Sequence, residues 1–137
     1  MNISYAVQKA LRNRLIGAAA VTSFVPANSI LDRNDRPAPD PSIIIGEDQV
    51  IDDGDMIDRS VSRIVSTLHV WKKESGLSGV KAIAAAVRDA IRQGRLALES
   101  GVKCIDCRVS DTRFLRDPDG ETAHGVVTIE TIVREVA

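Results

Sequence analysis

Arg59-Ser-Val-Ser-Arg-Ile-Val-Ser-Thr-Leu-His-Val-Trp71 and Ser78-Gly-Val-Lys-Ala-Ile-Ala-Ala-Ala-Val-Arg-Asp-Ala-Ile-Arg92 are the two stretches that decide the fold. The first alternates with a period of two and predicts a strand, whose apolar or small face consists of Ser62, Ile64, Ser66, Leu68 and Val70. The second repeats with the helical period and predicts one apolar stripe, made of Val80, Ile83, Ala84, Val87, Ala90 and Ile91. A Gly/Ser-rich breaker separates the two, so we expect the helix to fold back onto the sheet.

Before this unit, the sequence predicts a helix that runs to about Leu15. Ser4 is its candidate N-cap, and Val7 and Leu11 fall on the same side as Leu15. Gly17 is expected to end the helix, and residues 18–25 are expected to add another helical turn. A short strand is expected over residues 29–33. Three prolines between residues 34 and 41 predict an extended surface loop.

An acidic segment follows the compact apolar strand predicted for Ser42-Ile-Ile-Ile-Gly46. Residues 47–58 carry six carboxylates and no basic residue. Because like charges repel and Gly54 loosens the backbone, we expect a mobile loop that projects from the sheet. Its carboxylates are Glu47, Asp48, Asp52, Asp53, Asp55 and Asp58.

The C-terminal part predicts a β-hairpin. Residues 102–115 predict a long strand, with Ile105, Cys107 and Val109 on one face. Arg116-Asp-Pro-Asp-Gly120 predicts a turn, and residues 124–136 predict the closing strand. The order α-β-β-β-α-β-β, ending in a hairpin, indicates an α+β fold, in which one long helix and an N-terminal helix accompany an antiparallel β-sheet.

Composition limits the function classes. The chain has 137 residues with a net charge of −1, which argues against a polybasic nucleic-acid binder. No apolar run is long enough to span a membrane, and no signal peptide is evident at the start, so we expect a cytoplasmic origin. Hydrophobic residues make up 44% and aromatic residues 3%, so the core must rest on Val, Ile, Leu and Ala.

No motif in the sequence predicts catalysis. Cys104 and Cys107 form one C-x-x-C pair without a second pair, and on a regular strand their sulfurs would point to opposite faces. His69, beside Trp71, and His124 are the only histidines, and their spacing predicts neither a metal site nor a catalytic triad. The acidic segment does not follow the calcium-loop pattern, and phosphate and dinucleotide loops are absent from the sequence. We therefore expect no catalytic residue, no metal and no cofactor.

Several segments together resemble the tail terminator or tail-completion proteins of long-tailed phages and gene transfer agents. The resemblance covers nearly the whole chain, so it implies one tail-terminator-like domain over residues 1–137. Its most specific parts are the strand–Trp–loop–Ala-rich helix unit and the Arg-Asp-Pro-Asp-Gly turn. The segments that carry it are residues 7–15, Ser42-Ile-Ile-Ile-Gly-Glu-Asp48, Leu68-His-Val-Trp71, residues 80–91, Phe114-Leu-Arg-Asp-Pro-Asp-Gly120 and His124-Gly-Val-Val127.

The resemblance implies a non-enzymatic virion protein of the tail, assembled in the host cytoplasm. It implies a homohexameric ring at the head–tail junction, which ends tail-tube growth and joins the tail to the head connector or stopper protein. DNA would pass through the lumen without specific binding. We expect the acidic segment and the charged turn to contact the tube or connector; the turn contributes Arg116, Asp117, Asp119 and Glu121.

Two alternatives stay open at the level of sequence. A monomeric adaptor that caps the sheet edge of a partner would use the same charged segments. A small metal-dependent hydrolase would need a cluster of carboxylates that the spacing does not provide.

Overall fold

Five strands and three α-helices make up the computed structural model, which describes residues 1–32, 39–52 and 57–136. The sheet order is β1-β2-β3-β5-β4; β1 is parallel to β2, and all other neighbours are antiparallel. This arrangement confirms the predicted α+β class. In chain order the elements are α1 (Ile3–Ile16), α2 (Ala19–Thr22), the 3-10 turn η1 (Ala27–Ser29), β1 (Ile30–Leu31), β2 (Ser42–Ile51), β3 (Val61–Lys73), α3 (Ser78–Ile91), β4 (Val102–Arg116) and β5 (Thr122–Glu135).

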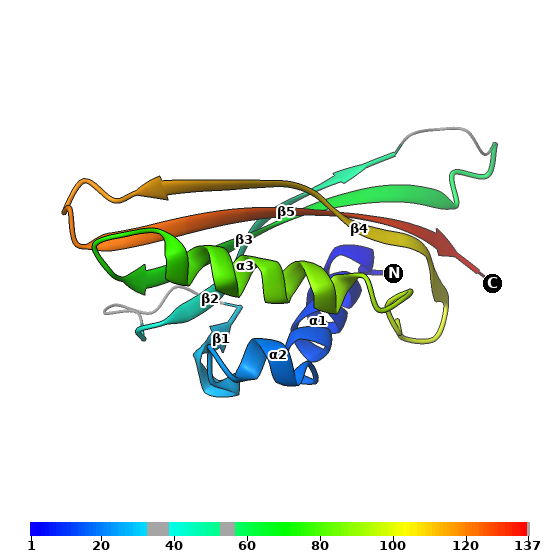
Figure 1. Cartoon of the computed structure of the whole chain (residues 1–137). Coiled ribbons are helices and arrows are strands. Elements are labelled where there is room, and N and C mark those ends of the chain that lie inside the picture. Colours follow the sequence, from blue (N-terminus) through cyan, green and yellow to red (C-terminus); the bar gives the residue numbers. More distant parts are fainter. Residues whose placement is uncertain (33–38, 53–56, 137) are drawn as a thin grey trace.

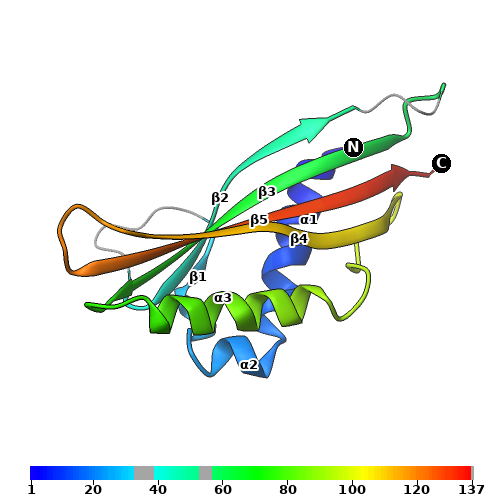
Figure 2. The same ribbon diagram turned by 45° about the horizontal axis from the view of Figure 1, so that its top comes forward.

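The helices lie together on one side of the sheet (Figures 1 and 2). The apolar stripe predicted for α3 is fully buried there, against the predicted inward row of β3. The stripe of Val7, Leu11 and Leu15 on α1 is buried in the same core. The inward row of β5 completes this core with Val127, Ile129, Thr131 and Val133, of which Thr131 is the polar member.

The start of α1 differs from the prediction. Asn2 is the N-cap, since its side-chain oxygen accepts a hydrogen bond from the backbone N–H of Tyr5. Ser4 lies inside the helix, and its hydroxyl donates to the carboxylate of Asp48 on β2. Choosing Ser4 as the cap was therefore wrong, because Asn2 offers the same capping chemistry one position before the first helical residue.

Side chains from outside the helix cap both ends of α3. At its start, the Glu74 carboxylate accepts hydrogen bonds from the backbone N–H groups of Gly79 and Val80, at 3.0 and 3.3 Å. At its end, the Arg14 guanidinium donates to carbonyl oxygens of the last helical residues and the following turn, including Ala90 at 2.9 Å and Arg95 at 2.8 Å. A negative group at the N-terminus and a positive group at the C-terminus both complement the helix dipole.

Two β-bulges in β4 change the predicted facing of Ile105, whereas Cys107 and Val109 share one face, packed against the core, as predicted. The register shifts between Cys104 and Asp106 and again between Val109 and Asp111. Ile105 is therefore 41% exposed, whereas Cys104 takes the buried position. Cys104 and Cys107 pair with Val133 and Thr131, which both face the core, so the prediction that the two sulfurs diverge was wrong. Both cysteines are free thiols, as expected.

Replacing Arg14 by Met should destabilise the protein by about 2–3 kcal/mol, because several carbonyl oxygens at the end of α3 lose a charged donor. Chemical denaturation measures this free energy of unfolding. Lys9→Met on the same helix is the matched control, since its contact with Glu99, at 3.6 Å, is exposed and should contribute less than about 1 kcal/mol. Equal effects of the two substitutions would contradict the capping role of Arg14.

Candidate functional site

The sheet face opposite the helices, here called the open face, carries a mixed polar and aromatic surface. Among the described residues, every helix lies on the other side (Figure 2). Strands β3 and β5 supply alternating side chains to the open face in register, so that Ile44, His69 and Val126 lie side by side on three strands. Its central members are Arg63, Val65, Thr67, His69 and Trp71 from β3 and His124, Val126, Thr128, Glu130 and Ile132 from β5.

A chain of hydrogen bonds crosses three strands on this face. The Nε2 atom of His69 lies 2.7 Å from a carboxylate oxygen of Glu47, and its Nδ1 atom lies 2.8 Å from Nε2 of His124. The His124 ring stacks on Trp71, with ring centroids 3.7 Å apart and planes 8° apart. No local pattern in the sequence indicates this cluster, because residues 69 and 124 meet only through the pairing of β3 with β5.

When both imidazoles are neutral, the contacts fix their proton positions. A carboxylate can only accept, so Nε2–H of His69 donates to Glu47. Nδ1 of His69 is then the acceptor, and Nε2–H of His124 donates to it. Burial, together with the neighbouring His69, lowers the pKa of His124 to about 4. The hydrogen bond from His69 lowers the pKa of Glu47.

A third β-bulge, in β2, brings Glu47 into this cluster. The register shifts between Ile45 and Asp48, so that two residues of β2 face one position of β3. One of the two is Gly46, over which the His69 ring packs: a Cβ atom at position 46 would lie 2.8 Å from Cδ2 of that ring. A glycine is therefore required for this close approach.

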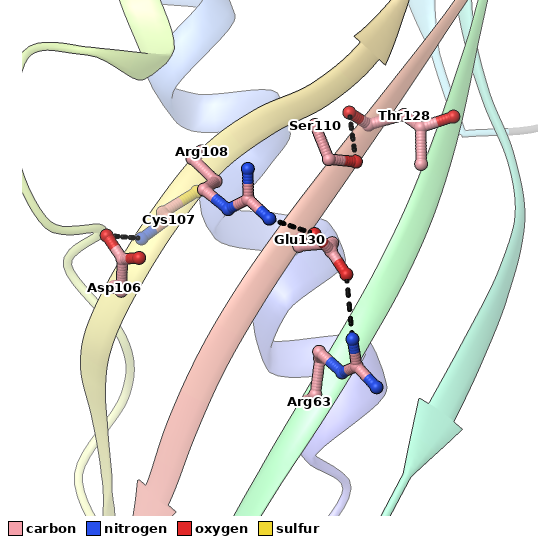
Figure 3. A network of polar contacts seen from close by, with 7 residues as sticks. All are labelled: Arg63, Asp106, Cys107, Arg108, Ser110, Thr128 and Glu130. Carbon is pink, nitrogen blue, oxygen red and sulfur yellow. Dashed lines mark hydrogen bonds and ion pairs between the residues drawn. The ribbon is translucent and has the colours of Figure 1, made fainter.

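A second polar network occupies the other end of the open face (Figure 3). The Glu130 carboxylate accepts from the guanidinium groups of Arg63 at 3.0 Å and Arg108 at 2.8 Å. Its side chain is only 16% exposed, so the pairing ties β3, β5 and β4 together across a largely desolvated carboxylate.

The predicted acidic loop is partly a strand. Residues 47–51 belong to β2, so predicting a loop from Glu47 onwards was wrong; pairing with β3 outweighs the repulsion between neighbouring carboxylates. Asp52 accepts from the hydroxyl of Ser62 at 3.0 Å, and Asp58 accepts from the backbone N–H of Ser60 at 3.1 Å, which lowers the Asp58 pKa. Asp53 and Asp55 lie outside the described residues.

The charged turn between β4 and β5 forms as predicted, with Gly120 at a φ of 73°. Asp119 holds the turn closed: its carboxylate accepts from the backbone N–H groups of Glu121 and Thr122, which lowers its pKa. Arg116 donates to the carbonyl oxygen of Ser75 at 2.7 Å and so ties the hairpin to the segment before α3. Asp117 and Glu121 are the other two residues of this turn that were predicted to contact a partner.

The structure therefore separates the predicted contact residues into two groups. Glu47, Asp48 and Asp52 lie at or beyond the bulge of β2, whereas Arg116 to Glu121 lie at the opposite end of the sheet (Figure 1). Within the described ranges, no group of three or more His, Cys, Asp or Glu side chains could hold a metal ion. No helix in those ranges is long and apolar enough to cross a membrane.

Acidification should weaken the fold through His124. Its folded pKa lies below the unfolded value of 6.5, so the unfolded chain binds more protons between pH 6.5 and about 4, and stability falls as the pH falls through this window. His124→Gln keeps an N–H donor for His69 and removes the titration. In this variant, the unfolding free energy should depend less steeply on pH. The change in slope should stay below the one-proton limit of about 1.4 kcal/mol per pH unit, because solvent screens the half-buried ring. An unchanged slope in urea titrations at several pH values would contradict this assignment.

Comparison with known proteins identifies the family. The family model described as "Tail completion protein gp17" matches residues 9–134. A chain in a solved structure of the virion of a native gene transfer agent (GTA) particle has 21% sequence identity and a TM-score of 0.81, and the match covers 96% of this chain and 97% of that chain. The gp17 protein of bacteriophage SPP1 has 19% identity and a TM-score of 0.64, with coverage of 100% and 93%. No curated protein matches this chain. The two structural likenesses establish the shared fold, and the match over residues 9–134 shows that the chain belongs to the tail completion protein gp17 family of phage tail structural proteins.

Proposed function

We propose that this chain forms a homohexameric ring at the head–tail junction, where it ends tail-tube growth and joins the tail to the head connector. The family match over residues 9–134 is the observation that carries this proposal, because it spans nearly the whole chain. Residues 1–137 would act as one tail-terminator-like domain. The family is one of structural tail proteins and is not known for catalysis, so the proposed role rests on shape and contact.

The shape of the molecule supports contacts with two different neighbours. The β2–β3 end and the β4–β5 turn extend in opposite directions along the sheet (Figure 1). We propose that one end meets the tail tube and the other meets the connector or stopper protein. The proposed contact residues are Asp52 and Asp58 at the first end, Glu47 and Asp48 at the bulge of β2, and Arg116, Asp117, Asp119 and Glu121 at the second end, together with Asp53 and Asp55.

These residues would not contribute equally. Asp119 and Arg116 are engaged within the turn and its neighbouring segment, so their main contribution is to hold the turn in shape. Glu121 is exposed, and Asp117 lies beside it at the base of the turn. These two side chains are better placed to touch a partner without loss of the fold. DNA would pass through the ring without specific binding, in keeping with the net charge of −1.

Particles made without this protein test the proposed role. Electron micrographs should then show tubes of uncontrolled length, or heads and tails that are not joined. Light scattering after size exclusion, with and without tail-tube protein, should show a hexamer in at least one condition. Normal joined particles would contradict the proposed role. A chain that stays monomeric throughout while binding a partner would instead favour a monomeric adaptor.

Charge reversal in the β4–β5 turn should weaken joining without unfolding the chain. In the variant with Asp117→Lys and Glu121→Lys, we expect binding to tube or connector protein to fall at least tenfold, with an unchanged thermal midpoint. Asp89→Lys, an exposed reversal on α3, is the control. Equal binding by the wild type, the double variant and the Asp89→Lys control in a pull-down would show that the turn is not part of the contact surface.

A further inference from the structure

A shallow groove of about 400 Å³ lies between α3 and the distal half of β4. Its floor is formed by Ala84, Ala85 and Phe114, and Lys81 and Arg88 lie on its rim. The Lys81 ammonium nitrogen is 5.6 Å from the centre of the Phe114 ring, a cation–π contact that keeps the positive charge beside the apolar floor. This α3–β4 groove therefore suits an apolar side chain carried on an acidic segment.

The end of the β2–β3 arm has that chemistry. Ile57 is 99% exposed and Val50 is 42% exposed. The neighbouring carboxylates of Asp52 and Asp58 accept hydrogen bonds from the hydroxyl or amide groups of serines, and the positive charge of Arg134 also acts on Asp58. The end of the arm therefore offers exposed apolar side chains beside carboxylates, which is the chemistry that the α3–β4 groove suits.

The two surfaces cannot meet within one molecule. Ile51 pairs with Arg63 at one end of β3, whereas Phe114 pairs with Gly125, which pairs with Val70 near the other end. Along β3, the positions of Arg63 and Val70 are seven residues apart, which corresponds to roughly 23 Å at about 3.3 Å per residue. Figure 1 shows the end of β2 and the start of α3 at opposite ends of the sheet.

We propose that the α3–β4 groove receives the acidic end of the β2–β3 arm of a second copy of this chain. This inference rests on the proposed ring and names the surfaces that would close it. Charge complementarity favours it, since the rim of the groove is cationic and the arm is acidic. Two different surfaces at opposite ends make a head-to-tail contact, which generates a ring when the rotation closes.

Edge-to-edge extension of the sheet is a poorer way to join the copies. Strand β4 is the outermost strand on its side of the described sheet, and its two bulges interrupt its pairing pattern. Arg108, Asp111 and Arg113 add charge along this edge. Bulges and charges are features that oppose the pairing of exposed edges.

Two charge substitutions test the contact by mutual rescue. Ile57→Lys places a cation on the arm, and Ala85→Glu places an anion in the groove. Each chain alone should lose assembly, because like charges then face each other in every contact. An equimolar mixture should recover the assembled species, since each variant arm or groove finds a compatible partner on the other chain. Assembly is measured by light scattering or, if the free wild-type chain is monomeric, by co-sedimentation with tail tubes.

Ala20→Glu and Ala20→Lys, at an exposed position of α2, are controls that should assemble normally. Circular dichroism verifies the fold of every variant. If the wild type assembles and either single variant also does, or if the mixture does not recover, the proposed contact is wrong while the ring stands. If the wild type assembles under no condition, both the ring and the contact are overturned.

Discussion

The packing of α3 against the inward rows of β3 and β5 is the interaction on which the rest of the structure depends. Ile83, Val87 and Ile91 are completely buried, as are Leu68 and Ile129 across from them. Each such side chain contributes about 1.5–3 kcal/mol by leaving water. Glu74 and Arg14 then fix both ends of this helix. Because the apolar rows face the helices, the opposite face of the sheet is left to polar and aromatic side chains.

The sequence predicted this packing because a period of two and a helical period are both visible in short windows. The stripes of α1 and α3, the inward row of β3 and the closing strand β5 are confirmed for this reason. The errors lie where a single residue breaks a period. With the bulge at Ile105, the Cys104 side chain faces the core. With the bulge at Gly46 and Glu47, β2 continues into the acidic segment as a strand. A bulge depends on the partner strand, so the local pattern does not reveal it.

The cluster of Glu47, His69, His124 and Trp71 was missed for a related reason. Its members come from three strands, and no spacing along the chain places them together. The carboxylate and two imidazoles lie in a line rather than around a common point. They tie β2, β3 and β5 together on the face that lacks helices. This bracing stiffens the middle of a long sheet whose two ends are proposed to touch different neighbours.

Family membership shows a structural protein of the phage tail, and the layout of the sheet fits the proposal that the molecule touches different neighbours with its two ends. Hydrogen–deuterium exchange of the chain, free and bound to tail tubes, tests this most directly. We predict new protection of backbone amides at the one hairpin end that meets the tube, around residues 57–60 or around residues 117–121, with the amides of α1 unchanged. Protection confined to α1, or no change at either hairpin end, would contradict the account.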